Sequence, residues 1–319
     1  MPRALICGVG GQDGAYLARL LLDKGYEVHG TSRDAQVNSF ERLARLGIRE
    51  RVHTFSMSLH DFRSVLWGLK RVRPDEVYNL SGQSSVGLSF GQPVETHDSI
   101  ALGTLNLLEA VRFTELPIRL YNAGSSECFG NTPEPADEAT PFRPRSPYAV
   151  AKAAAHWEVS NYREAYGLYA CTGILFNHES PLRPARFVTR KIVKAACRIA
   201  AGDPEPLRLG NLAVRRDWGW APEYVEAMWR MLQRPEPEDF VVATGKTCSL
   251  EDFVREVFAA AGLDWREHVL RDPELLRPLD VAVSRASPRR ARERLGWEAR
   301  CTMPEVARRL LHAERTGEV

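Results

Sequence analysis

The chain has 319 residues, 44% of them hydrophobic, and its 43 basic residues nearly balance 41 acidic ones. This balance, without a long run of like charge, argues against a nucleic-acid-binding protein. No apolar stretch reaches the roughly 20 residues of a membrane span, and no leader peptide is recognisable, so we expect a cytoplasmic protein without a membrane partner. The six scattered cysteines lack metal-ligand spacing, so no metal site is expected.

Predicted strands and helices alternate along the first half of the chain. Strands are expected at residues 4–7, 27–31, 52–56, 76–80, 119–122 and 170–176, and helices at 12–24, 38–46, 63–71, 100–113 and 147–166. This order predicts an α/β fold with a doubly wound parallel (Rossmann) sheet.

The second half of the chain has a different pattern. Residues 177–210 contain basic and proline-rich turns, and a helix at 221–232, a strand at 240–243 and a helix at 250–261 follow. Because 319 residues exceed one compact domain, we predict two domains. A dinucleotide-binding domain comprises 1–176, to which 214–243 return, and a smaller, intertwined domain comprises 177–213 and 244–319.

A glycine motif follows the first predicted strand. Gly8, Gly11 and Gly14 have the spacing that permits a tight turn and close approach of a pyrophosphate to a helix N-terminus. The second strand is followed by Arg33, where an NAD-binding fold usually has an acid for the ribose. An arginine suits the 2′-phosphate of NADP instead, although an ordinary surface arginine remains an alternative.

Four side chains form a candidate catalytic set. Tyr148 and Lys152 lie four residues apart in a predicted helix and therefore share one face. A phenol titrates near ~10, and a neighbouring ammonium favours the phenolate, so we expect Lys152 to tune Tyr148 as a base. Ser125 and Glu127 follow the strand before this helix, at the sheet edge where ligands bind. A hydroxyl can bind an alcohol, and a carboxylate can move a proton.

These residues resemble the extended short-chain dehydrogenase/reductase superfamily. Longer stretches are similar to its GDP-mannose 4,6-dehydratase family, at residues 11–16, 144–152, 161–166, 173–181, 187–191 and 216–219. The resemblance implies an internal redox cycle on bound NADP that yields a 4-keto-6-deoxy sugar. Tyr148 would take the proton from the sugar O4, assisted by Ser125 and Lys152. Glu127 would remove the C5 proton and help the C6 hydroxyl to depart.

The same resemblance implies two sets of binding residues. NADP would contact Gly8, Gly11, Gln12, Asp13, Gly14, Arg33, Ser58, Leu59, Leu80, Gln83, Ser84, Tyr148, Lys152, His178 and Arg183. The GDP-sugar would contact Asn177, Val188, Lys191, Arg216 and Arg277. For His178, a histidine satisfied within the core is an equal alternative. The family also implies a homodimer or homotetramer.

The chain departs from the family pattern at a few positions. Arg33-Asp34 stands where the family has two arginines, and Gly10 and Ser125 stand where it has threonine. Three functions remain open: dehydration of GDP-mannose, the same chemistry on another GDP-sugar such as a heptose or an N-acetylhexosamine, or a catalytically silent NADP-binding sensor or scaffold. The intact catalytic set argues against the last.

Overall fold

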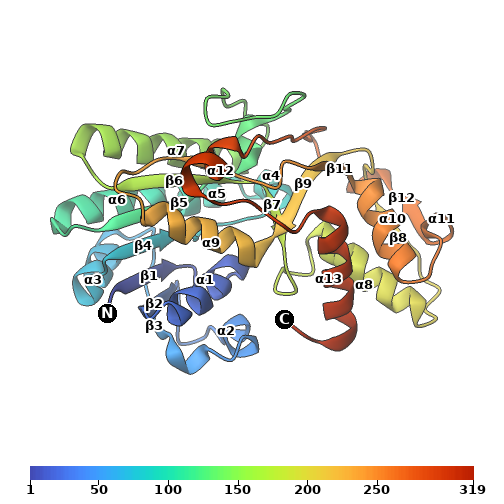
Figure 1. The fold of residues 1–319 in the computed structure, drawn as a ribbon, viewed down its shortest axis with the longest axis horizontal. Helices are drawn as coiled ribbons and strands as arrows, with labels where there is room; N and C mark the ends of the chain where they lie inside the picture. The colour runs from blue at the N-terminus through green and yellow to red at the C-terminus, as the bar shows by residue number, and fades with distance from the viewer.

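A computed structural model describes residues 1–319 and is built around a seven-stranded parallel sheet (Figure 1). The strand order is β10-β6-β5-β4-β1-β2-β3. These strands are β1 (Arg3–Cys7), β2 (Glu27–Ser32), β3 (His53–Ser56), β4 (Glu76–Asn79), β5 (Arg119–Ala123), β6 (Ala170–Leu175) and β10 (Phe240–Val242). The predicted doubly wound sheet is therefore confirmed.

Helices cover both faces of this sheet because both faces are apolar. In β1, Ala4 and Ile6 join the core on one side, whereas Leu5 and Cys7 join the core on the other. The first side is covered by α1 (Gln12–Asp23), α2 (Glu41–Arg45) and α9 (Ala221–Leu232), and the second by α3 (Phe62–Val72), α6 (Gly103–Thr114) and α7 (Pro147–Tyr166). Between β4 and α6 the chain forms α4 (Val86–Gly91), α5 (Pro93–His97) and a π-helical turn, Asp98–Leu102.

A second core lies at one end of the sheet (Figure 1). It is formed mainly by α8 (Val188–Ala200), α10 (Leu250–Ala260) and α13 (Met303–Thr316), which pack around Trp218. Small sheets border it, namely β7 (Asn177–Glu179) with β9 (Arg215–Trp220) and β11 (Thr247–Ser249), and β8 (Leu207–Leu209) with β12 (Val269–Arg271). The remaining helices are α11 (Trp265–His268) and α12 (Arg289–Leu295).

Three predictions about local structure were wrong. Residues 177–210 are not only turns, because α8 lies within them and buries Ile192, Val193 and Ile199 on one face. The predicted helix 38–46 shortens to α2, and the helices α4 and α5 were not predicted. The helices α4 and α5 are each only a turn or two long, too short to show a helical period in the sequence. No helix of the chain has the length and apolar character needed to cross a bilayer.

Candidate active site

The carboxyl ends of the parallel strands border two adjoining cavities of about 440 and 610 Å³. The first cavity extends toward the second core, and the second lies over the glycine turn. They share Asp13, residues 80–84, Arg183, Arg186 and Phe187. Every site residue expected from the sequence lines at least one of them, so the fold brings the whole predicted set together.

Tyr148 and Lys152 enter the first cavity from the start of α7. Ser146 caps this helix, its Oγ accepting from the backbone N of Ala149 at 3.1 Å, and Pro147 occupies the first helical position. Both side chains are buried. Nζ of Lys152 donates to the carbonyl oxygen of Ala123 at 2.7 Å, and burial lowers its pKa to about 8.

The pKa of Tyr148 differs from the expectation. Burial raises it above the ordinary value of a phenol, and the neighbouring Ser125 hydroxyl opposes this shift only in part. The ammonium of Lys152 is held by a carbonyl of β5 and does not reverse the effect of burial. Tyr148 is therefore a neutral phenol in the ligand-free protein.

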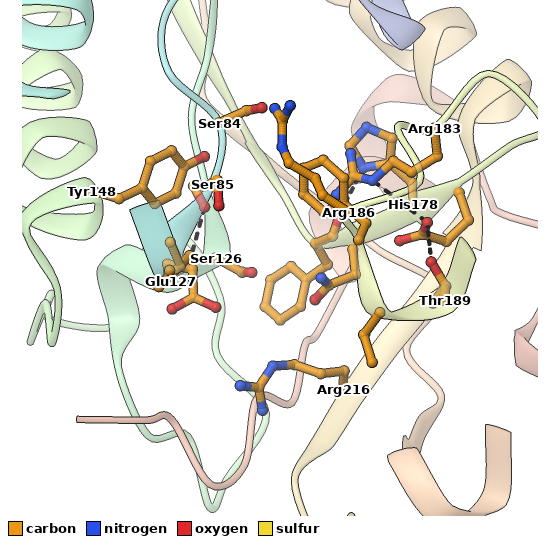
Figure 2. A pocket seen from close by; sticks show the side chains of 18 of the residues that line it. Ser84, Ser85, Ser126, Glu127, Tyr148, His178, Arg183, Arg186, Thr189 and Arg216 are labelled. Carbon is orange, nitrogen blue, oxygen red and sulfur yellow. Dashed lines mark hydrogen bonds and ion pairs between the residues drawn. The ribbon is translucent and has the colours of Figure 1, made fainter. Parts of the chain in front are cut away.

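Ser125 and Glu127 lie on the tight turn after β5. Figure 2 shows the side chain of Glu127 on the same side of the cavity as Tyr148. Oγ of Ser125 accepts from the backbone N of Glu127 at 3.3 Å, which fixes the start of this turn. Burial raises the pKa of Glu127, while the positive charges of Arg216 and Arg277 oppose the rise and Asp280 adds to it. A carboxyl group whose pKa is raised by burial holds a proton more readily, which suits it to act as a general acid as well as a base.

Two arginines of the first cavity share one carboxylate. Oδ1 of Asp280 lies 3.2 Å from Nη2 of Arg216 and 3.3 Å from Nη1 of Arg277. Arg216 is buried on β9, whereas Arg277 lies on an exposed loop. Figure 2 shows the Arg216 guanidinium facing the same space as Glu127. Two guanidinium groups side by side can bind a diphosphate.

The glycine turn is closely packed against its surroundings. A Cβ atom at Gly14 would lie 2.5 Å from the carbonyl oxygen of Gly8, and one at Gly8 would lie 3.0 Å from that of Leu80. The N-terminus of α1 begins after Gly11 and has no side-chain cap. Its first backbone N–H groups are therefore free to bind an anion that lies close to the turn.

His178 is a buried histidine with partners at both ring nitrogens, and it also lines the first cavity. Its Nε2 lies 2.9 Å from Oδ2 of Asp13, and its ring stacks on Tyr224 with 4.5 Å between centroids. Gln12 donates from Nε2 to Asp13 at 2.9 Å and accepts from the Ser180 hydroxyl at 2.9 Å. The predicted residues Gln12 and Asp13 thus hold β7 against α1.

The far end of the second cavity is lined by Thr31, Ser32 and Arg33, together with the predicted residues Ser58 and Leu59. Nη2 of Arg33 lies 3.1 Å from Oε1 of Glu95 on α5. Asp34 does not line the cavity, because its Oδ1 accepts from the backbone N of Gln36 at 2.9 Å. The cation of the Arg33-Asp34 pair, and not the anion, therefore faces this space.

The remaining predicted residues Asn177, Val188 and Lys191 line the outer part of the first cavity, where Nζ of Lys191 donates to the carbonyl oxygen of Arg208 at 2.8 Å. Sequence reasoning missed other lining residues, namely Arg42, Ser85, Glu95, Ser126, Arg186 and Asp280. Ser85 and Ser126 adjoin predicted residues, and Asp280 stands three residues after Arg277, so proximity could have indicated these three. Nothing in the sequence indicates Arg42, Glu95 or Arg186.

Comparisons with known proteins identify the family of the chain. A profile of the GDP-mannose 4,6 dehydratase family matches residues 5–310. GDP-mannose 4,6 dehydratase 1 of Arabidopsis thaliana is 47% identical over 97% of this chain and 88% of that protein. The human GDP-mannose 4,6 dehydratase is 43% identical over 98% of this chain and 91% of that protein.

Solved structures show the same fold. The UDP-glucose 4-epimerase of Thermus thermophilus, in complex with NAD, superposes with a TM-score of 0.85, at 28% identity and over 98% of this chain and 99% of that one. A dTDP-glucose 4,6-dehydratase from Bacillus anthracis has a TM-score of 0.85 at 16% identity, over 99% of this chain and 97% of that one, and supports the fold alone. The resemblance found in the sequence is thus confirmed, and the chain belongs to the GDP-mannose 4,6 dehydratase family.

Proposed function

We propose that the protein is a hydro-lyase that converts GDP-mannose to GDP-4-keto-6-deoxymannose with NADP as its resident cofactor. The observation that carries this proposal is the placement of Glu127 in one cavity with Ser125, Tyr148 and Lys152. Oxidation of an alcohol needs only the last three, whereas elimination of water needs a further acid and base. Glu127 supplies that extra group.

The residues of the chain divide the proton transfers between them. Tyr148, once in its phenolate form, takes the proton of the sugar O4 hydroxyl, which Ser125 orients by a hydrogen bond. Glu127 removes the proton at C5 and then protonates the C6 oxygen so that it leaves as water. One carboxyl group can do both because the proton that it takes from C5 is the one that it gives to the C6 oxygen, and the burial that raises its pKa favours holding that proton in between. NADP, when bound, would supply the hydride chemistry, taking the hydride from C4 and returning it to C6, and the proton taken from O4 balances the one that C5 regains.

Three features of the second cavity fit a dinucleotide with a 2′-phosphate. The glycine turn leaves no room for a Cβ atom at Gly14, and the uncapped start of α1 suits a pyrophosphate. Arg33 faces the cavity while Asp34 turns onto its own loop, which favours NADP over NAD. Of the remaining predicted cofactor residues, Leu80, Gln83, Ser84 and Arg183 line both cavities, and His178 lines the first.

The nucleotide-sugar would occupy the first cavity. Arg216 and Arg277 would bind its diphosphate, which Asn177 would also approach. Val188 and Lys191 would flank the guanine. A homologous enzyme solved with NAD supports a nicotinamide dinucleotide in the neighbouring groove.

We also propose that the chain forms a homodimer or a homotetramer. Val94 on α5 and Val150 and Trp157 on α7 are 71%, 49% and 61% exposed, on helices that pack side by side. A second copy would bury these apolar side chains. We keep as a proposal the division into a cofactor domain of residues 1–176 and 214–243 and a substrate domain of residues 177–213 and 244–319. The cores do not follow this division throughout, because Ala291, Leu295 and Trp297 pack in the sheet core and Trp218 packs in the second core.

Mass spectrometry tests the cofactor and the substrate in one preparation. Denaturing the purified protein should release NADP, because the cofactor is regenerated in every cycle. Incubation with GDP-mannose should yield a product lighter by one water, with little turnover of a GDP-heptose or a GDP-N-acetylhexosamine. Release of NAD would refute the cofactor assignment, and dehydration of another GDP-sugar alone would refute the substrate.

A further inference from the structure

Arg186 is the only cation of the two cavities that has no partner in the structure. The other arginines and lysines that line them donate to a backbone carbonyl or lie within 4.0 Å of a carboxylate, namely Arg33, Arg42, Lys152, Arg183, Lys191, Arg216 and Arg277. Arg186 lines both cavities and is exposed, and its closest described contact is the ring of Phe187, at 5.2 Å. Its charge is therefore available to a ligand.

Arg186 lies on a segment that is hydrogen-bonded, through Arg42, to the glycine turn. Arg42 donates from Nη1 to the carbonyl oxygen of Gly10 and from Nε to that of Leu182, both at 2.8 Å, and so ties the turn to the segment that carries Arg186. Burial lowers the pKa of Arg42; the charge of Glu41 opposes this, while those of Arg186 and Arg45 add to it. Like charges thus gather beside the uncapped N-terminus of α1, an arrangement that an anion would stabilise.

We propose that Arg186 binds the pyrophosphate of the dinucleotide, reaching it from the side opposite the glycine turn. This inference rests on the proposed function, because it assumes that a nicotinamide dinucleotide occupies the second cavity. Figure 2 shows the Arg186 side chain directed toward the space beside Ser84, on the path between the cavities. The substrate diphosphate already has two guanidinium groups of its own, on Arg216 and Arg277, whereas the glycine turn offers only backbone donors.

Arg186 would also compensate for a missing charge. The loop after β2 carries Arg33 followed by Asp34, so only one cation of this loop faces the second cavity. Arg186 adds a cation from a segment about 150 residues further along the chain. The dinucleotide would then bridge α1 and the turn before α8.

The test compares Arg186→Ala and Arg186→Lys with Arg271→Ala, which removes an exposed arginine that lies outside both cavities. Calorimetric titrations of the cofactor-stripped protein with NADP, NAD and GDP, at low and high salt, give the affinities. If the contact is charge-assisted, Arg186→Ala should lower the affinity for both dinucleotides by about 10-fold or more. The affinity of this variant should also depend less steeply on salt concentration. Arg186→Lys should recover part of the lost affinity. The Arg186 variants should keep the GDP affinity of the unaltered protein, and Arg271→Ala should keep its affinity for all three ligands.

The outcomes separate the possible roles of the guanidinium. Because NAD and NADP both contain the pyrophosphate, the affinities for the two dinucleotides must fall by a similar factor. A loss confined to NADP would assign Arg186 to the 2′-phosphate and overturn the proposal, as would a loss of GDP affinity with dinucleotide binding retained. Failure of the unaltered protein to bind either dinucleotide would refute the proposed function itself.

Discussion

Oδ2 of Asp13 lies 2.9 Å from Nε2 of His178, and this contact joins the start of α1 to β7. The other ring nitrogen of His178 lies 2.7 Å from the carbonyl oxygen of Phe176. Both nitrogens therefore face acceptors, an arrangement that only the doubly protonated imidazolium satisfies. The pair carries one positive and one negative charge where the two cavities meet.

Replacing Asp13 with Asn should lower the pKa of His178. Burial by itself lowers that pKa, but the charge and hydrogen bond of Asp13 outweigh burial and raise it. In Asp13→Asn, burial still lowers the pKa of His178, but the carboxylate charge that raised it is lost. Imidazole NMR signals followed through a pH titration should show His178 losing its proton at a lower pH than in the unaltered protein.

The same pair predicts a pH window for stability. Because the folded-state pKa of His178 is raised, its charge adds stability that is fully present below about pH 6.5. Because the folded-state pKa of Asp13 is lowered, its charge adds stability that is fully present above about pH 3.9. The pair therefore contributes most to stability between these two pH values. Its contribution falls as the pH rises through the folded-state pKa of His178. Urea unfolding should show a larger deficit for Asp13→Asn at pH 5 than at pH 9, whereas Asp23→Asn, an exposed change on the same helix, should show none. Equal deficits at both values would contradict an ion pair.

Tyr148→Phe should remove the base without altering the packing of α7, because only the hydroxyl is lost. Turnover should fall by about 10² to 10⁴, while the melting temperature stays close to that of the unaltered protein. Lys152→Met should also reduce turnover. It removes a buried ammonium on the same face of α7, which contacts the carbonyl oxygen of Ala123 beside the reacting groups. Near-normal dehydration by Tyr148→Phe would show that another group is the base.

Glu127→Gln should block elimination while leaving substrate binding intact, because glutamine keeps the size of the side chain but cannot take the C5 proton. Product formation should fall by about 10² to 10⁴. GDP-sugar affinity should change little, since the binding residues lie on other elements. Quenched assays in heavy water, read by mass spectrometry, provide the check. Deuterium at C5 of the recovered sugar at the normal rate would rule out Glu127 as the base at that carbon.

Arg216→Ala should weaken binding of the nucleotide-sugar and not of NADP. A charge-assisted contact of about 1.5 to 3 kcal/mol corresponds to roughly a 10- to 150-fold loss of GDP affinity. Arg215→Ala is the matched control, because neighbouring residues of a strand face opposite sides. Titration of the NADP-loaded variants with GDP measures the difference. Equal GDP affinities for the two variants would mean that Arg216 supports the fold alone, through its contact with Asp280 at 3.2 Å.

Sequence patterns predicted the parallel sheet well because its strands are short apolar runs separated by strong helix and turn signals. The start of α7 was also predictable, since Ser146 and Pro147 form a recognisable helix beginning. The amphipathic helix α8 was missed because basic and proline-rich segments surround it, and its apolar face becomes evident only against α10 and α13.

The residues that line the site could be predicted from the sequence, but their pKa shifts and charge pairing could not. Residues of the expected set line the two cavities because parallel strands end at one edge. The spacing of Tyr148 and Lys152 suggested a lowered phenol pKa, yet the depth at which α7 buries the phenol reverses that shift. Burial depends on long-range packing, as does the carboxylate of Asp280 between Arg216 and Arg277, and neither can be read from local spacing.

The internal redox cycle is the central claim, and a labelled substrate tests it most directly. GDP-mannose carrying deuterium at C4 would be incubated with the protein and its bound NADP, and the product analysed by NMR. If one NADP serves a complete cycle within the closed site, deuterium should appear at C6 of the 4-keto-6-deoxy sugar, with no net consumption of NADP. Loss of the deuterium from the product, or a product that retains its C6 hydroxyl, would contradict the account.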